Sequence, residues 1–156
     1  MNLILWRHAE AEEQHAEGDL ARELTPHGRK QATRVAKWLQ PRLPKRFTVL
    51  ASPAVRTCTT AEALESPYTI DPRLAPDADV ADVLDACGWP DGPEGAGGTV
   101  VLVGHQPTLG RIANLLLAGH EAEWAVKKGA LWWLSTRERE DRLQVVLRAA
   151  IGPDLA

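Results

Sequence analysis

Two basic residues stand directly behind four apolar ones in Leu3-Ile4-Leu5-Trp6-Arg7-His8. Apolar runs of this length, without polar alternation, are typical of strands that are buried on both faces of a parallel sheet. A second such run, Val100–Val103, leads to Gly104-His105. Ligands of open α/β sheets collect at the carboxyl ends of the strands. The two histidines are therefore predicted to meet in one cleft, although they are far apart in the sequence.

Helices are predicted between the strands, and several share one starting signal. Thr25 is expected to cap a helix with Pro26 at its first position, where a missing N–H costs nothing. Ser52-Pro53 repeats this start after a strand at Phe47–Ala51, and Pro107 opens a further helix. The predicted helices run from Pro26 to a stop at Pro41, from Ser52-Pro53 to about Glu65, from Ala78 to Cys87, and from Pro107 to Gly119.

The remaining segments complete a three-layer α/β plan. Ala130–Leu134 and Leu143–Leu147 flank the charged stretch Arg137–Arg142, as the strands of a hairpin do. A short strand is expected near Tyr68–Ile70, and the proline- and glycine-rich stretch Trp89–Gly98 is predicted to be a surface loop. Strands that alternate with helices predict a three-layer α/β fold, with residues 1–156 as a single domain.

Composition narrows the class of protein. Hydrophobic residues make up 44% and charged residues 25% of the 156 residues, and the formal net charge is −3. This balance gives no bulk attraction to nucleic acid or to a membrane surface, so any anion site must be local. Cys58 and Cys87 fall within predicted helices and are expected to be buried, inert thiols. With no signal peptide or membrane span in the pattern, a cytoplasmic protein is expected.

Three predicted loops carry basic side chains toward the same edge of the sheet. They hold Arg7-His8, Arg56 and His105, and guanidinium groups match phosphate oxygens with paired donors. A tetrahedral oxyanion is therefore the expected occupant. A neutral imidazole beside it can attack phosphorus and hold the phosphoryl group covalently, and nearby arginines lower the histidine pKa so that the lone pair stays free. This chemistry requires no metal and no cofactor.

Four blocks of the sequence, in this order, resemble the histidine phosphatase superfamily. They are residues 5–10, residues 24–28, Ala51-Ser52-Pro53 with Arg56, and residues 104–107. The chain length and the placing of Asp19 and Arg22 ahead of the first helix are similar to the compact SixA-like phosphohistidine phosphatase branch. The resemblance implies a phosphoglycerate mutase-like α/β/α sandwich, whose sheet is mostly parallel with an antiparallel edge.

The same resemblance implies roles for the basic residues. His8 is the implied phosphorylated nucleophile, while Arg7, Arg56 and His105 bind the phosphoryl group and Arg22 makes a secondary contact at the rim. The implied reaction is two in-line displacements, first by His8 and then by water. We therefore expect a metal-independent phosphatase that acts on protein phosphohistidine or a small phosphoramidate, with a phosphorylated protein or small phosphorylated substrate as its partner.

The general acid has no single match in the sequence. Larger members of the superfamily place an acidic proton donor after the second arginine block, where Asp77 and Asp79 are candidates here. Both carboxylates are alternatively helix caps, and Asp19 is a third candidate acid. Without an acid, the enzyme should prefer a leaving group that departs unaided, and phosphohistidine nitrogen fits this better than a sugar alkoxide.

Other functions remain open at this point. A non-catalytic phosphate- or phosphoprotein-binding module needs the same arginines. A phosphomonoester phosphatase or mutase of small metabolites needs a closed pocket, for which the chain offers few residues between Arg56 and His105. A metal site is a further alternative, because Glu10, Glu12 and Glu13 lie close to His8. The nearby arginines, however, repel cations. Lys127-Lys128 is either a solvated charge pair or a pair that steers an acidic partner.

Overall fold

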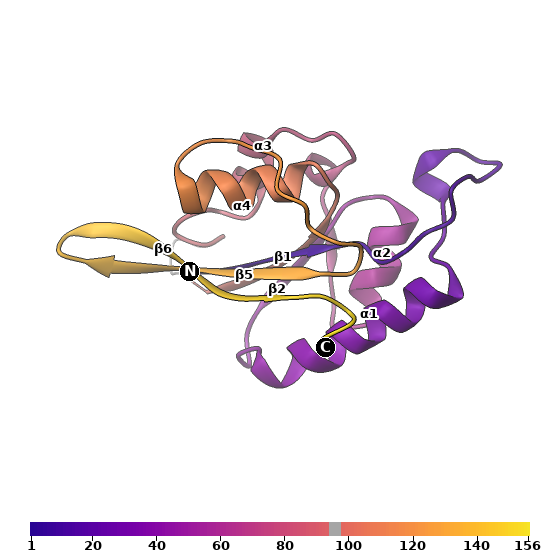
Figure 1. The fold of residues 1–156 in the computed structure, drawn as a ribbon, viewed down its shortest axis with the longest axis horizontal. Coiled ribbons are helices and arrows are strands. Elements are labelled where there is room, and N and C mark those ends of the chain that lie inside the picture. The colour runs from indigo at the N-terminus through magenta and orange to yellow at the C-terminus, as the bar shows by residue number, and fades with distance from the viewer. Residues whose placement is uncertain (94–97) are drawn as a thin grey trace.

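A six-stranded mixed sheet lies between two layers of helices in the computed structural model, which describes residues 1–93 and 98–156 (Figure 1). The strand order is β3-β2-β4-β1-β5-β6. The strands are β1 (Asn2–Arg7), β2 (Thr48–Ala51), β3 (Thr69–Ile70), β4 (Thr99–Gly104), β5 (Leu131–Arg139) and β6 (Arg142–Ile151). The helices are α1 (Pro26–Leu39), α2 (Val55–Glu62), α3 (Val80–Ala86) and α4 (Thr108–Ala118), with short 3₁₀ turns η1 (Asp19–Ala21), η2 (Gln40–Arg42) and η3 (Pro72–Leu74).

The predicted fold class is confirmed. β3, β2, β4 and β1 run parallel, and β5 and β6 add an antiparallel edge. Along β1, Leu3 and Leu5 pack into a core with α3 and α4, whereas Ile4 and Trp6 pack into a second core with α1 and α2. Because successive strand side chains point to opposite faces, an apolar run without alternation supplies both cores at once.

The parallel strands bring the predicted site segments to one edge. β1 pairs with β4 in the register Leu5↔Leu102. The backbone N–H of His8 donates to the Gly104 carbonyl at 3.1 Å, and that of Ser52 donates to the Val103 carbonyl at 3.1 Å. The residues that follow β1, β2 and β4 therefore emerge side by side.

Helix α1 begins as predicted, but the predicted starts of the helices at Ser52-Pro53 and at Pro107 were wrong. The Thr25 hydroxyl accepts a hydrogen bond from the Gly28 N–H at 2.9 Å, with Pro26 at the first helical position. α2 begins at Val55, because Ala54 keeps an extended backbone (φ −68°, ψ 141°) and serves as the N-cap. α4 begins one residue later than predicted and takes Pro107 as its N-cap, and α3 begins at Val80 rather than Ala78.

The C-terminal hairpin is confirmed, with strands longer than expected. Glu140 and Asp141 form its turn with φ of 52° and 58°, the positive values that two-residue hairpin loops favour. Of the predicted loop Trp89–Gly98, residues 94–97 lie outside the described part of the chain. Across residues 1–93 and 98–156, no helix combines the length and apolar character that a bilayer crossing needs.

Both cysteines are free, as predicted. Cys87 is buried, and burial raises the pKa of its thiol to about 12. Cys58 is half-buried, and burial raises its thiol pKa as well. A thiol that is protonated at neutral pH is a poor nucleophile, so both side chains act as packing groups.

The first turn of α1 lies directly against the loop that follows His8. The Thr25 N–H donates to the Glu10 carbonyl at 3.0 Å, and the Glu10 N–H donates to the Gln31 side chain at 2.9 Å. Gly28 allows this approach, because a Cβ at that position would overlap the Glu10 carbonyl oxygen. The glycine therefore sets how closely α1 holds the loop.

Replacing Gly28 by alanine is expected to destabilise the protein by about 1–3 kcal/mol, the usual cost of forcing a methyl group into a filled space. Equilibrium urea unfolding at pH 7 measures this loss. The exposed Arg29→Ala change on the same helix is the control and should stay within about 0.5 kcal/mol of the wild type. A Gly28→Ala variant as stable as this control would contradict the close packing.

Candidate active site

A cavity of about 190 Å³ lies at the carboxyl ends of the parallel strands. Its lining includes every basic side chain that the resemblance assigned to the site. Asp19 does not line it but bonds Arg22 and Arg56. The lining residues are Arg7, His8, Ala11, Arg22, Arg56, Pro76, His105, Gln106 and Lys128. The three loops thus meet as expected, and we call this space the arginine cavity.

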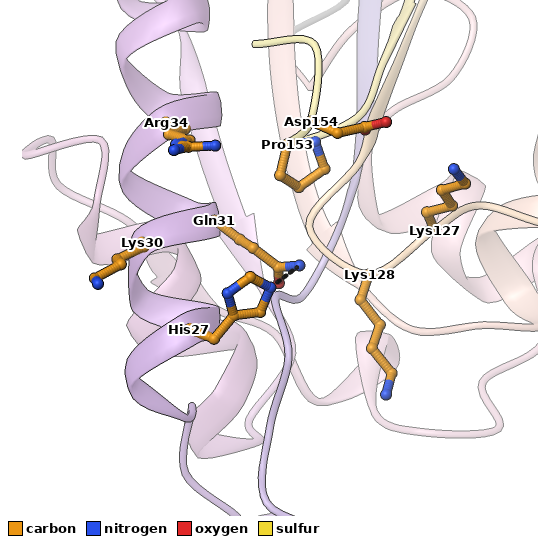
Figure 2. Close-up of a pocket in the computed structure, with 8 residues that line it drawn as sticks. All are labelled: His27, Lys30, Gln31, Arg34, Lys127, Lys128, Pro153 and Asp154. Carbon is orange, nitrogen blue, oxygen red and sulfur yellow. Dashed lines mark hydrogen bonds between the residues drawn. The ribbon is translucent and has the colours of Figure 1, made fainter.

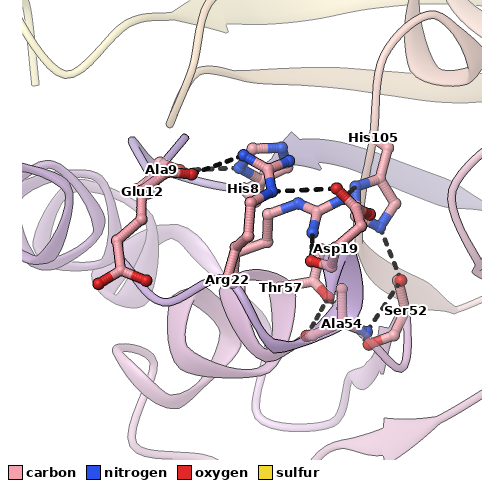
Figure 3. Close-up of polar contacts among 10 residues, drawn as sticks. His8, Ala9, Glu12, Asp19, Arg22, Ser52, Ala54, Thr57 and His105 are labelled. Carbon is pink, nitrogen blue, oxygen red and sulfur yellow. Dashed lines mark hydrogen bonds and ion pairs between the residues drawn. The ribbon is translucent and has the colours of Figure 1, made fainter. Parts of the chain in front are cut away.

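His8 is held in one tautomer by its own loop. Its Nδ1 lies 2.8 Å from the Ala9 carbonyl oxygen, which can only accept, so Nδ1 carries the proton and Nε2 keeps a lone pair (Figure 3). Burial is the main reason that the pKa of His8 is lowered to about 4. The bond to the Ala9 carbonyl raises the pKa, and the nearby charges of Arg56 and Arg7 lower it further. At neutral pH the ring is therefore uncharged, with an unprotonated Nε2.

His105 lies close to His8, with the ring centres 5.3 Å apart. Its Nδ1 is 3.3 Å from the Arg56 Nη2, and its Nε2 is 2.7 Å from the Ser52 hydroxyl (Figure 3). Because a guanidinium only donates, Nδ1 accepts from Arg56 and the Nε2–H donates to Ser52. Burial, then the Arg56 charge, lowers the pKa of His105 to about 3. The same hydroxyl accepts from the Ala54 N–H at 3.3 Å, in the turn that precedes α2.

The two arginines that flank His8 keep unused donors. Arg56 is 3% exposed and donates through Nη1 to the Asp19 carbonyl at 2.9 Å, and Arg7 donates through Nη1 to the Val126 carbonyl at 2.7 Å. Within the described residues, the buried Nε–H of each has no acceptor. Leaving a buried donor unpaired costs about 1–3 kcal/mol. An oxyanion in the arginine cavity is the kind of ligand that such donors suit.

Asp19 links two of the arginines. Its carboxylate accepts from the Arg22 Nε at 3.0 Å and from the Arg56 Nη2 at 3.2 Å. Burial raises the pKa of Asp19, but the Arg56 charge and the bonds from both arginines outweigh it, and the net pKa is lowered. Asp19 is therefore ionised at neutral pH, which suits holding arginines in place and not donating a proton.

The two other acid candidates do not line the arginine cavity. Asp77 and Asp79 line a separate cavity of about 260 Å³ with Pro107, Thr108 and Arg111 among its walls. Asp79 occupies the N-cap position of α3, but its side chain accepts no capping bond there. The prediction that Asp79 lies at the N-cap of α3 is thus confirmed, but the prediction that its carboxylate caps the helix was wrong.

The glutamates after His8 have structural partners. The Glu10 carboxylate accepts from the Thr25 hydroxyl at 2.8 Å, and the Glu12 carboxylate accepts from the Glu23 N–H at 3.1 Å, while Glu13 is exposed. In the described part of the chain, no three His, Cys, Asp or Glu side chains are grouped as metal ligands. These carboxylates fix the loop that carries His8.

Three further residues at the site were not predicted. Ser52 was expected only as a helix cap, and the sequence gives no sign that its hydroxyl meets His105. Gln106, next to His105, bonds the Gly110 N–H and the Trp124 carbonyl and thereby anchors the start of α4. Lys128 lines the arginine cavity because the segment before β5 returns beside β1, where the Gly129 N–H donates to the His8 carbonyl at 3.0 Å.

Comparison with known proteins supports the resemblance drawn from the sequence. Residues 3–77 match the family model described as histidine phosphatase superfamily (branch 1). No curated protein sequence matches the chain.

Several solved structures share the fold over nearly their whole length. The protein histidine phosphatase SixA in complex with tungstate is 22% identical, with a TM-score of 0.83, over 99% of this chain and 98% of that one. A protein named as phosphohistidine phosphatase SixA from Nakamurella multipartitia is 26% identical, with a TM-score of 0.75, over 97% and 95%. A phosphoserine phosphatase mutant from Entamoeba histolytica, in complex with phosphoserine, is 18% identical, with a TM-score of 0.65, over 96% and 95%.

The buried neutral histidines are expected to make the protein less stable as the pH falls below 6.5. Their pKa values are about 4 and about 3 in the folded state against 6.5 unfolded, so the unfolded chain takes up protons first. Between pH 7 and pH 5 the free energy of unfolding should fall by about 1–2 kcal/mol for each buried histidine, as measured by urea unfolding.

In the His8→Gln variant, the free energy of unfolding should fall less between pH 7 and pH 5, because the contribution of one buried histidine is lost. The exposed His120→Gln variant is the control and should keep the wild-type dependence. If all three proteins lose stability equally between pH 7 and pH 5, His8 is not buried in its neutral form.

Proposed function

Because residues 3–77 match the histidine phosphatase superfamily model, we propose that the chain is a metal-independent phosphatase that removes the phosphoryl group from phosphohistidine on a protein. One observation carries this proposal. The Nε2 lone pair of His8 is free in a cavity lined by Arg7 and Arg56, because the Ala9 carbonyl holds the proton on Nδ1. Two cysteines without a disulfide suit work in the cytoplasm.

The first step transfers the phosphoryl group to the enzyme. The Nε2 of His8 attacks phosphorus and the bond from phosphorus to the substrate nitrogen breaks. Its electron pair stays on the substrate ring, which leaves as neutral imidazole because its other ring nitrogen carries a proton before the transfer. Arg7 and Arg56 offer donors to the phosphoryl oxygens as charge spreads over them, and fixed donors of this kind need no reorganisation during the reaction. The Ala9 carbonyl stabilises His8 as it becomes cationic.

The second step returns the enzyme to its starting state. Water attacks phosphorus in line with the bond to His8, and that bond breaks with its electron pair returning to Nε2. Inorganic phosphate leaves and retains the protons of the water molecule. His8 ends as the same neutral tautomer, so each cycle needs no cofactor.

The substrate class follows from the leaving group. Among the described residues that line the arginine cavity there is no carboxyl group to protonate a departing alkoxide, and Asp19 beside it is ionised. The nitrogen of phosphohistidine leaves with little help, whereas a serine or sugar alkoxide does not. The tungstate held by the SixA relative is a tetrahedral oxyanion, as a phosphoryl group is. Phosphoester hydrolysis is the second candidate, since a phosphoserine phosphatase shares the fold.

Replacing His8 by alanine is expected to reduce turnover of a phosphohistidine peptide at least about 10³-fold, because the covalent route is lost. Rapid quenching of the wild type, with EDTA present throughout, should trap acid-labile phosphate on the protein, and the His8→Ala variant should trap none. The exposed His120→Ala variant is the control and should retain both properties. Phosphate trapped on the His8→Ala protein would place the nucleophile elsewhere.

The leaving group is expected to decide the single-turnover rate. A phosphohistidine peptide should be cleaved at least about 10²-fold faster than an alkyl phosphate at pH 7, since the missing general acid is worth about 10²–10⁴ in rate. Rapid-quench measurements with enzyme in excess compare the two. Equal rates would favour the phosphoester phosphatase instead.

A further inference from the structure

A second and larger space, of about 510 Å³, lies beside the arginine cavity. Figure 2 shows α1 on one side of it and the segment that carries Lys127 and Lys128 on the other. We call it the α1 groove. Its lining residues are His27, Lys30, Gln31, Arg34, Lys127, Lys128, Pro153 and Asp154.

The charge of the α1 groove is positive and is not neutralised by the protein. Lys30, Arg34, Lys127 and Lys128 are all exposed, and no carboxylate within the described residues lies within 4.0 Å of their charged nitrogens. Asp154 is the single carboxylate in the lining. The whole chain has a formal net charge of −3, so this surface departs from the overall balance. Unpaired cations in a groove attract a negatively charged partner.

The α1 groove and the arginine cavity are neighbours. Lys128 lines both spaces. Both walls are also tied to the loop of His8, since the Gln31 side chain accepts from the Glu10 N–H at 2.9 Å and the Gly129 N–H donates to the His8 carbonyl at 3.0 Å. A ligand with its phosphoryl group at His8 therefore passes Lys128 as it extends into the groove.

We propose that the α1 groove binds an acidic segment of the phosphorylated protein, a proposal that rests on the phosphatase function above. The arginine cavity, at about 190 Å³, has room for a phosphoryl group and little more, so the rest of a protein substrate must lie outside it. The α1 groove offers over twice that volume, with four cations that match aspartate and glutamate side chains. Buried Pro153 adds an apolar wall for the backbone of an extended segment.

The test compares three substrates on a charge-reversed protein. The substrates are a phosphohistidine peptide with Asp and Glu on both sides, the same peptide with Asn and Gln in their place, and phosphoramidate. In the K30E/R34E variant, kcat/KM for the acidic peptide should fall about tenfold or more through KM, because several exposed charge pairs are lost and repulsion replaces them. The kcat value, and kcat/KM for the neutral peptide and for phosphoramidate, should stay within about twofold.

The control is K37E, which reverses an exposed charge on α1 outside the groove lining. It should leave kcat/KM for the acidic peptide within about twofold of the wild type. An equal loss in K37E and K30E/R34E, or an equal loss for acidic and neutral peptides, overturns the groove as the docking site. If anionic phospholipid vesicles bind the wild type and not K30E/R34E while the acidic peptide shows no difference, the occupant is a membrane and the proposal is wrong.

Binding separates this proposal from the phosphatase function. Fluorescence anisotropy with the unphosphorylated acidic peptide measures the groove without turnover, and K30E/R34E should bind it at least about tenfold more weakly than the wild type. Equal binding by the two proteins overturns the docking proposal, whatever the activity. Loss of binding in the variant, together with no hydrolysis of any substrate by the wild type, keeps the docking site and rejects the phosphatase.

Discussion

The parallel pairing of β1 with β4 is the constraint on which the site depends. It brings His8 and His105 to the same edge of the sheet, and the N–H of His8 completes the pairing by donating to the Gly104 carbonyl. β2 lies on the other side of β4, so Ser52 and Arg56 arrive at the same place. Both faces of β1 and β4 are buried, which makes this register costly to shift, because a one-residue slip would turn every side chain to the opposite core.

The burial of ionisable groups at the site lowers the stability of the fold. Two imidazoles are buried in neutral form beside Arg56, which is itself buried, and burial lowers the pKa of Arg56 despite its bonds to Asp19. Hydrogen bonds hold these groups in place: the Ala9 carbonyl accepts from His8 and the Val126 carbonyl accepts from Arg7, while His105 bonds the side chains of Ser52 and Arg56. The lowered pKa that keeps His8 uncharged is therefore a consequence of the same burial that orders the site.

Sequence patterns predicted the parts of the molecule that local rules control. The apolar runs of β1 and β4, the capped start of α1 and the hairpin of β5 and β6 follow from periodicity and turn chemistry, and the resemblance added the roles of the basic residues. The start of α2 was wrong because the backbone stays extended through Ala54. The contact of Ser52 with His105 was hidden because it joins residues far apart in the sequence. Lys128 was similarly hidden, since its place depends on the antiparallel return of the chain beside β1.

The two adjoining cavities together restrict the substrate more than either does alone. On the proposed function, a site with an ionised Asp19, and with no carboxyl group in its described lining, would favour a leaving group that departs as a neutral imidazole. A small phosphoramidate satisfies that requirement but leaves the four cations of the α1 groove without a partner, whereas a phosphorylated protein with acidic neighbours satisfies both. On the proposed function, steering by those cations would also raise the rate of encounter with such a protein, a gain that matters most for a chain whose own net charge is negative.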